Sequence, residues 1–285
     1  GITVYLRRFT LPSEYMFHIR NANPGDMRAL LDVLTVFPES KTTAEILQRS
    51  DELGLAVRDR AHFDALPAAR DLGLVEDGAN RITAKGKALA QIDRVNPTIF
   101  ADIVHLLHYT LWNPTTPAVN CFSFSYRTVC KELWNGGSSS SLNRRELAAK
   151  VEATANGQFK RSDISLSQKS IGGALDWLYE LRPEVFSGDG EQFVRRSFCP
   201  PESLVLAIEH RYRECELDYG ANLLLSGTHR EALCQACVLE LDGLDRVLDY
   251  AIAQFSYLEK GIGGGWGQYI TLQGPVEIEG FVQLR

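Results

Sequence analysis

Residues 41–92 read KTTAEILQRSDELGLAVRDRAHFDALPAARDLGLVEDGANRITAKGKALAQI, and this stretch decides the expected fold. Near its start, Thr42 can cap a helix and Glu45 can reach back to the cap, which is the capping-box pattern. Two helical runs follow. Each ends at a glycine, Gly54 in the first and Gly73 in the second, as helix C-termini prefer.

The second half of this stretch predicts a turn over residues 76–80, a short strand at residues 81–83 and a third helix from Ala84. Pro67 falls inside the second helical run, where it either kinks the helix or moves its start. Helix, turn, helix and two short strands around a loop are typical of a winged helix-turn-helix.

The flanking segments complete a first domain, residues 1–113. Residues 1–25 alternate apolar and polar side chains, which predicts a short strand or hairpin. Asp26 is the expected cap of the next helix, and Pro97 is well placed in the first turn of an apolar helix over residues 97–113. The prolines that follow break the chain.

Residues 118–200 repeat this logic and predict a second winged helix. A helix is expected over residues 122–134. In the next helix Asn143 caps and Glu146 occupies the third helical position. A possible Ser165/Gln168 capping box opens the third helix, and residues 184–198 predict a hairpin.

The second domain also supplies the candidate DNA contacts. The N-terminal part of the third helix of such a motif enters the major groove, so Ser167, Gln168 and Lys169 are the expected base readers. Gly172 and Gly173 would let a DNA backbone come close. The residues expected to contact phosphates are basic and lie on the helices and the hairpin: Arg144, Arg145, Lys160, Arg161, Arg195 and Arg196.

Residues 201–285 predict an acidic helical domain that ends in a hairpin and could be a third winged helix. Helices are expected over residues 203–216, 230–239 and 244–258, followed by strands at 269–272 and 276–284. The glycine-rich stretch 260–267 lacks the Gly-Lys-Ser/Thr ending of a phosphate loop. It is interpreted as a hairpin loop that carries Trp266 at its tip for a partner. The fold class is therefore mainly α with short β-hairpins (α+β), built from tandem winged helix-turn-helix domains.

Charge is distributed unevenly along the chain. Residues 126–200 carry eleven basic and nine acidic side chains, whereas residues 201–285 carry six basic and thirteen acidic ones. Because duplex binding depends on Lys and Arg contacts to phosphate, only the middle region suits DNA, and the acidic C-terminal third suits a protein partner. No apolar stretch approaches the roughly 20 residues of a membrane span, and irregularly spaced cysteines favour a reducing cytoplasm.

The sequence offers two weak metal-binding patterns. Cys199, Cys215, Cys234 and Cys237 form a set that a zinc or iron–sulfur site would use, but Cys-x-x-Cys lies in an apolar helical run and the other spacings match no standard pattern. His105 and His108 share a helical face without a third ligand nearby. No metal, other cofactor or enzymatic activity is predicted.

Three stretches support a family resemblance: Phe17–Arg20, Leu72–Val75 together with Thr83–Lys87, and Leu106–Trp112. Their order resembles that of a bacterial family of unknown function whose multi-winged-helix proteins are encoded near DNA phosphorothioation and other phage-defence genes. The resemblance spans about the first 125 residues. It implies a defence-linked, DNA-associated accessory protein and no established active site.

The main hypothesis is a cytoplasmic double-stranded-DNA-binding regulator or the DNA-engaging component of an antiviral defence system. The alternative is a non-catalytic assembly subunit, similar to those that clasp the linker chain of chromosome-organising ATPases, with its partner at the acidic C-terminal domain. A metal sensor is the third hypothesis, and a homodimer is left open.

Overall fold

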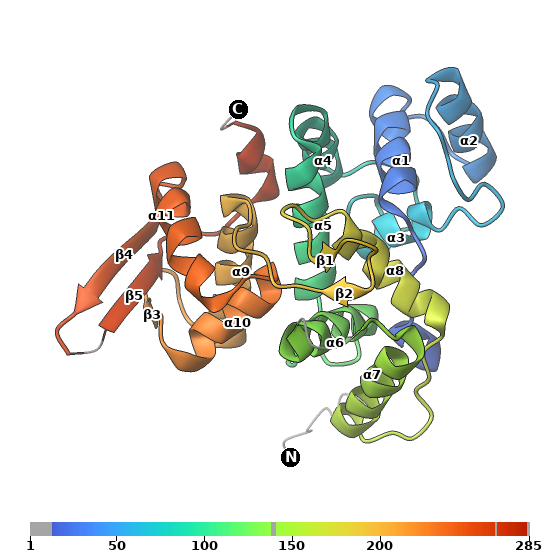
Figure 1. Cartoon of the computed structure of the whole chain (residues 1–285). Coiled ribbons are helices and arrows are strands. Elements are labelled where there is room, and N and C mark those ends of the chain that lie inside the picture. Colours follow the sequence, from blue (N-terminus) through green and yellow to red (C-terminus); the bar gives the residue numbers. More distant parts are fainter. Residues whose placement is uncertain (1–12, 138–140, 266, 284–285) are drawn as a thin grey trace, which may run out of the picture.

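The computed structural model describes residues 13–137, 141–265 and 267–283, and over these it is mainly helical with two small antiparallel sheets. This agrees with the α+β class expected from the sequence. Figure 1 shows α5 (Pro97–Thr110) in the middle of the molecule. In this view α1 to α3 lie on one side of it, and α9 to α11 with a three-stranded sheet lie on the other.

The described parts of residues 1–113, 118–200 and 201–285 are called here the first, second and third unit. The first unit begins with helices that the sequence largely predicts. Thr42 Oγ1 accepts a hydrogen bond from Glu45 N at 3.1 Å, and the Glu45 carboxylate accepts one from Thr42 N at 3.2 Å, so the capping box is confirmed. Gly54 and Gly73 have positive φ just beyond the ends of their helices. The helices before α5 are α1 (Pro24–Val36), α2 (Thr43–Glu52), α3 (Ala65–Asp71) and α4 (Ala84–Val95).

Of the expectations for the first unit, the leading strand is wrong and the wing is only partly met, while the alternative left open at Pro67 is decided. Residues 14–17 form a 3-10 helix, η1 (Glu14–Phe17), in place of a strand, and residues 1–12 lie outside the described part. Pro67 moves the start of α3 to Ala65, which puts the proline in the first turn, where its missing N–H costs nothing. The expected wing is reduced to one antiparallel bridge between Val75 and Ile82.

The second unit matches its predicted element order. Asn143 caps α7, accepting from Arg145 N and Glu146 N at 3.1 Å each. The cap of α8 is Ser167 and not Ser165, because Ser167 Oγ accepts from Ser170 N. The elements are α6 (Cys121–Gly136), α7 (Arg144–Phe159), α8 (Gln168–Tyr179), β1 (Phe186–Ser187) and β2 (Gln192–Phe193).

The third unit runs helix, strand, helix, helix, strand, strand, and its sheet has the order β3-β5-β4. The elements are α9 (Pro201–Glu214), β3 (Asn222–Leu224), α10 (Gly227–Cys237), η3 (Leu241–Gly243), α11 (Leu244–Gln254), β4 (Leu258–Gly263), β5 (Gly267–Leu272) and η4 (Ile278–Val282).

The hairpin of this unit is not the one expected. Residues 276–284 were expected to pair with β5, but residues 278–282 form the 3-10 helix η4. The partner of β5 is β4, in a register that sets Leu258 opposite Leu272 and Gly263 opposite Gly267. The glycine-rich stretch therefore does connect two strands, while Trp266 lies outside the described residues.

The three units share one continuous apolar core that surrounds α5. This helix packs against α4, α6, α8, α9 and α10, and η4 returns to pack on α4. Across the described chain, none of the helices combines the length and the apolar character needed to cross a membrane.

Candidate nucleic-acid interface

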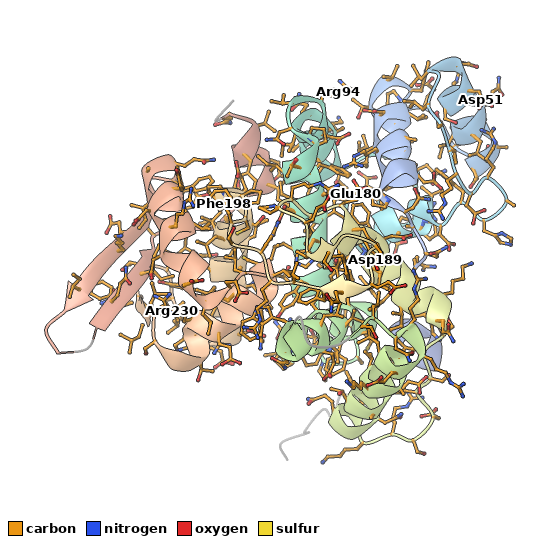
Figure 2. All side chains as sticks on the ribbon, in the orientation of Figure 1. Asp51, Arg94, Glu180, Asp189, Phe198 and Arg230 are labelled. Atoms are coloured by element: carbon orange, nitrogen blue, oxygen red, sulfur yellow. The ribbon has the colours of Figure 1, made fainter. Side chains whose placement is uncertain are left out.

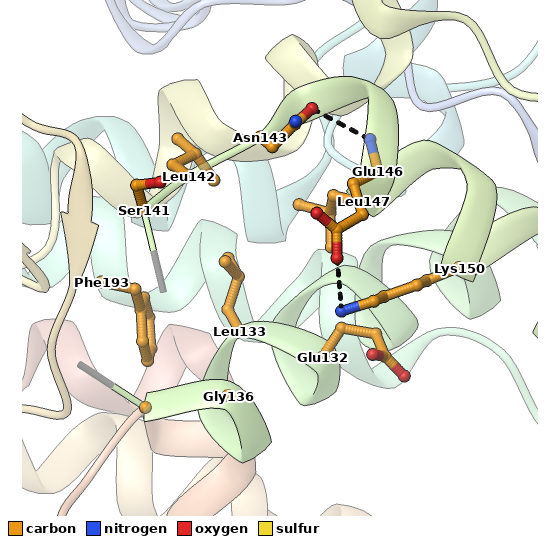
Figure 3. Close-up of a pocket in the computed structure, with 11 residues that line it drawn as sticks. Glu132, Leu133, Gly136, Ser141, Leu142, Asn143, Glu146, Leu147, Lys150 and Phe193 are labelled. Carbon is orange, nitrogen blue, oxygen red and sulfur yellow. Dashed lines mark hydrogen bonds and ion pairs between the residues drawn. The ribbon is translucent and has the colours of Figure 1, made fainter. Parts of the chain in front are cut away.

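The N-terminus of α7 presents two arginines at its first two helical positions. Arg144 and Arg145 are both exposed. Figure 3 shows the capping hydrogen bond that Glu146 N donates to Asn143 Oδ1 and the ion pair between Glu146 and Lys150, which measures 3.2 Å. Glu146 is thus paired within its own helix, and the two arginines add positive charge to a helix end that is already electropositive.

The N-terminus of α8 presents the expected base readers. Ser167, Gln168 and Lys169 are exposed, although the Ser167 hydroxyl is engaged in capping the helix. Arg144 extends across to this helix, because a β-carbon built at Gly172 would lie 3.4 Å from its Nη1 atom. The structure thus brings the starts of α7 and α8 together on one surface.

The two glycines of α8 do not serve the approach of DNA. Both are buried; the Arg144 side chain lies beside Gly172, and the N-terminal segment of the chain covers Gly173. Ile19 N donates to Ser170 Oγ at 2.7 Å, and a β-carbon at Gly173 would lie 2.5 Å from the Arg20 carbonyl oxygen. The expectation for Gly172 and Gly173 is therefore wrong, since the backbone that Gly173 admits belongs to the chain itself.

Replacing Gly173 by alanine is expected to destabilise the protein by about 1–3 kcal/mol, because the methyl group overlaps the Arg20 carbonyl. The matched control is Gly157→Ala in α7, where a β-carbon meets nothing within 4 Å. That change should stabilise by about 0.5–1 kcal/mol through helix propensity. Urea unfolding of both variants checks this, and equal effects would contradict the packing assigned to Gly173.

Two of the expected phosphate contacts are not available to DNA. Arg196 is wrong as a site residue, because its side chain is fully buried and pairs with Asp102. Arg195 donates two hydrogen bonds to Trp134 O, and its guanidinium lies 3.5 Å from the centroid of the Trp134 ring. The turn that joins β1 to β2 carries exposed Asp189 and Glu191, which repel phosphate.

The remaining two expected contacts lie at the far end of α7. Arg161 pairs with Asp163, and only 13% of its side chain is exposed. Lys160 is exposed and occupies the left-handed C-cap position of α7. Among the nine residues singled out by the sequence, the structure therefore leaves six exposed: Arg144, Arg145, Lys160, Ser167, Gln168 and Lys169.

Arg58 joins this surface from the first unit, and the sequence analysis missed it. Asp26 was expected to cap α1, but Asn23 does so, and the Asp26 carboxylate instead accepts hydrogen bonds from Arg58 N and Asp59 N. This contact holds the loop before α3 against the start of α1. Burial raises the pKa of the Asp176 carboxyl, and the nearby charges of Arg58 and Arg144 oppose that shift. No sequence pattern announces such a contact between separate units.

The histidine pair of α5 is packed and hydrogen-bonded. His105 Nε2 lies 2.8 Å from Ala236 O and Nδ1 lies 2.8 Å from Tyr126 Oη. A carbonyl oxygen only accepts, so Nε2 carries the proton and Nδ1 accepts from the tyrosine. His108 Nδ1 donates to Val104 O, and its ring stacks on Tyr126.

These buried histidines predict a loss of stability in acid. Burial lowers the pKa of His105, His108 and His210 to about 4, from 6.5. Between these values the unfolded chain takes up protons that the folded chain excludes. Stability therefore falls as the pH drops from about 6.5 to 4, by about 1.4 kcal/mol per pH unit for each histidine.

The measurement is the free energy of unfolding in urea between pH 7.5 and 5. His108→Gln should flatten its pH dependence, since one of the three histidines with a strongly lowered pKa is lost. His62→Gln is the control, because 75% of that side chain is exposed. Parallel curves for the wild type and His108→Gln would contradict the prediction.

Three of the four cysteines considered as a metal set are buried where the second and third units meet. Cys199, Cys234 and Cys237 lie near one another, with Cys199 and Cys237 hydrogen-bonded, and burial raises the pKa of the Cys234 thiol to about 12. Cys215 caps the end of α9. Within the described ranges, no group of three or more His, Cys, Asp or Glu side chains is arranged to hold a metal ion.

The third unit presents an acidic and partly apolar surface. The exposed face of α11 carries Tyr250 and the carboxylates of Asp245 and Asp249, which pair with Arg230 and Lys260, and Ile262 near the end of β4 is 87% exposed. A groove of about 850 Å³ lies where the three units meet. Its apolar lining includes Ile99, Pro183, Phe198, Pro200 and Pro201, and Figure 2 shows Phe198 beside α9.

Comparison with known proteins adds no family to this picture. No protein-family model matches the chain, and no curated protein or solved structure matches it either.

Proposed function

We propose that the chain is a non-enzymatic DNA-binding protein built from winged helix-turn-helix units, with the second unit as its duplex-engaging part. The observation that carries this proposal is the exposed cationic surface formed by Arg144, Arg145 and Lys169 at the starts of α7 and α8. In a helix-turn-helix, the start of the second helix of the motif enters the major groove and the preceding helix contacts the backbone.

The order of elements supports the winged-helix part of the proposal. The third unit has a helix, a strand, two helices and two further strands in this order. Its three strands form a sheet in which the last strand, β5, lies between the other two. That arrangement fits a helix-turn-helix with a β-hairpin wing. The second unit has three helices and a hairpin in the same order, with α7 and α8 as the helix-turn-helix.

The charges at the start of α7 support a phosphate ligand. Each arginine there opposes the helix dipole, at a cost of about 0.3–1 kcal/mol. A phosphate at this end would turn the cost into an attraction, since both the dipole and the guanidinium groups favour an anion. The neighbouring Arg58 would extend the same contact along the duplex backbone.

The test is a fluorescence-anisotropy titration with random duplex DNA at two salt concentrations. Affinity should fall steeply with salt, because each phosphate contact contributes about −0.9 to the slope of log K against log salt. Combined Arg144→Gln, Arg145→Gln and Lys169→Gln should weaken binding and reduce that slope by about 3. The control combines Lys41→Gln, Lys85→Gln and Lys87→Gln, which remove the same charge from the first unit.

The proposal would be contradicted if both triple variants lost binding equally, or if the wild type did not bind DNA at low salt. Sequence-specific enrichment from a random library would favour a regulator. Within the same proposal, the family resemblance points to a component of a bacterial defence system. Phage plating on cells with and without the gene tests that role.

A second candidate is an assembly subunit whose partner binds the third unit. The exposed Ile262 and Tyr250 and the net acidic charge of residues 201–285 favour it, because exposed apolar and aromatic side chains on an acidic unit suit a protein partner better than DNA. Light scattering over a range of protein concentrations checks the case in which the partner is a second copy. Ile262→Ser should then shift the dimerisation midpoint to higher concentration, and a monomer throughout would exclude that case.

A further inference from the structure

We propose that a cavity between α6, α9 and α10 binds a small oxyanion of the phosphate class. The cavity is lined by Arg127 and Lys131 from α6 and by His210, Arg211 and Glu214 from α9. The proposal is independent of DNA binding, because none of these side chains belongs to the surface of α7 and α8.

The charges around this cavity do not balance. Glu214 is its one carboxylate, and three groups converge on it: Arg127 Nη1 at 2.7 Å, Arg211 Nη1 at 3.1 Å and His210 Nε2 at 3.3 Å. The two arginines outnumber the carboxylate, and Lys131 adds a further positive charge. Two units of positive charge therefore remain unmatched.

Lys131 is the group that points to a missing anion. Among the residues that the structure describes, none forms a hydrogen bond or ion pair with its ammonium group, although the side chain is half-buried. Burial and the charges of Arg127 and Arg211 lower the pKa of Lys131, and Glu214 opposes them only in part. A cation held among cations is stabilised by an anion at close range.

The other side chains shape the cavity for a compact ligand. Arg127 is fixed by donating to Tyr109 O and Trp112 O, and only 7% of its side chain is exposed. The opposite wall is apolar, with Ala207 from α9 and Ala232, Leu233 and Ala236 from α10. The cavity holds about 80 Å³, whereas one water needs only about 10–15 Å³ of such space, so a four-oxygen anion fits and a nucleoside does not.

The first test is calorimetric titration of the full chain with inorganic phosphate at constant ionic strength. Saturable one-site binding is expected, and Lys131→Gln should weaken it about ten-fold or more, as loss of a charged hydrogen-bond donor does. Lys150→Gln is the matched control, because that lysine already pairs with Glu146 and should stay within about two-fold of the wild type.

Two further arms separate the sources of phosphate. Adenosine 5′-monophosphate in place of phosphate should bind at least ten-fold more weakly, because the cavity excludes the nucleoside. Arg145→Gln should leave phosphate affinity unchanged. If Arg145→Gln abolishes binding while Lys131→Gln does not, the ion lies at the start of α7 and the proposal fails.

The second test uses the unaltered protein and so does not depend on how a variant folds. Limiting acetic anhydride should modify Lys131 readily at pH 8, because its pKa is lowered, and saturating phosphate should slow this reaction about five-fold or more. Peptide mass spectrometry reads Lys131 and Lys150 in the same sample. Equal rates with and without phosphate, or no saturable binding by calorimetry, would overturn the proposal.

Discussion

Replacing Asp102 by alanine is expected to lower the free energy of unfolding by about 3–5 kcal/mol, the typical result of removing one partner from a buried ion pair. Asp102 and Arg196 have no exposed side-chain surface, and Arg196 Nη1 lies 3.1 Å from Asp102 Oδ2. Ser203 Oγ donates to the same carboxylate at 2.9 Å. Alanine would leave a guanidinium in the core without a counter-charge.

The effect should be large because this pair connects all three units. Asp102 belongs to α5, and Arg196 precedes α9 and donates to the carbonyl oxygens of Arg182 and Cys237. Those carbonyls follow α8 and end α10, respectively. Losing the pair therefore weakens contacts between segments that are nearly a hundred residues apart in the chain.

The controls for Asp102 separate burial from charge. Asp51→Ala removes the partner of Arg60 in an ion pair whose side chains are exposed, Arg60 by 45% and Asp51 by 60%. It should lower the free energy of unfolding by at most about 1 kcal/mol. Combined Asp102→Leu and Arg196→Met should recover much of the loss, because matched apolar groups replace both charges. If Asp102→Ala costs no more than Asp51→Ala, the buried pair does not stabilise the fold.

The features that the sequence predicts well are those in which a few neighbouring residues determine the local conformation. The capping box of Thr42 and Glu45 and the cap at Asn143 are confirmed because each closes its hydrogen bonds within four residues. Gly54 and Gly73 end their helices for the same local reason, the ease with which glycine adopts a positive φ.

The features that fail depend on contacts distant in sequence. Arg196 is a basic residue in a predicted hairpin, which suggested a phosphate contact, but its partner Asp102 lies 94 residues earlier in the chain. The need for glycine at position 173 comes from the segment of Ile19 and Arg20, which is held there by a hydrogen bond to Ser170, 151 residues away. The β4 strand was hidden because Leu258 continues the apolar spacing of α11, and only pairing with β5 assigns it to the sheet. Arg58 was missed for a related reason, since its loop reaches α8 through the fold alone.

In contrast to Asp102→Ala, Arg145→Glu is expected to make the protein more stable while it weakens DNA binding. A negative charge at the second position of α7 favours the helix dipole, so the free energy of unfolding should rise by about 0.3–1 kcal/mol or more. The same change places a carboxylate where the proposal puts a DNA phosphate. Affinity for random duplex should then fall about ten-fold or more at low salt, and the salt slope should decrease by about 1.

The matched control for this prediction is Lys85→Glu, because Lys85 holds the second position of α4 as Arg145 does in α7. Both variants change the net charge by the same amount and improve the same kind of helix end. If DNA attraction were a property of overall charge, both would lose affinity equally. A selective loss in Arg145→Glu, with stability raised in both, would separate a defined phosphate contact from general electrostatics, since a less stable or misfolded protein could not produce that pair of results.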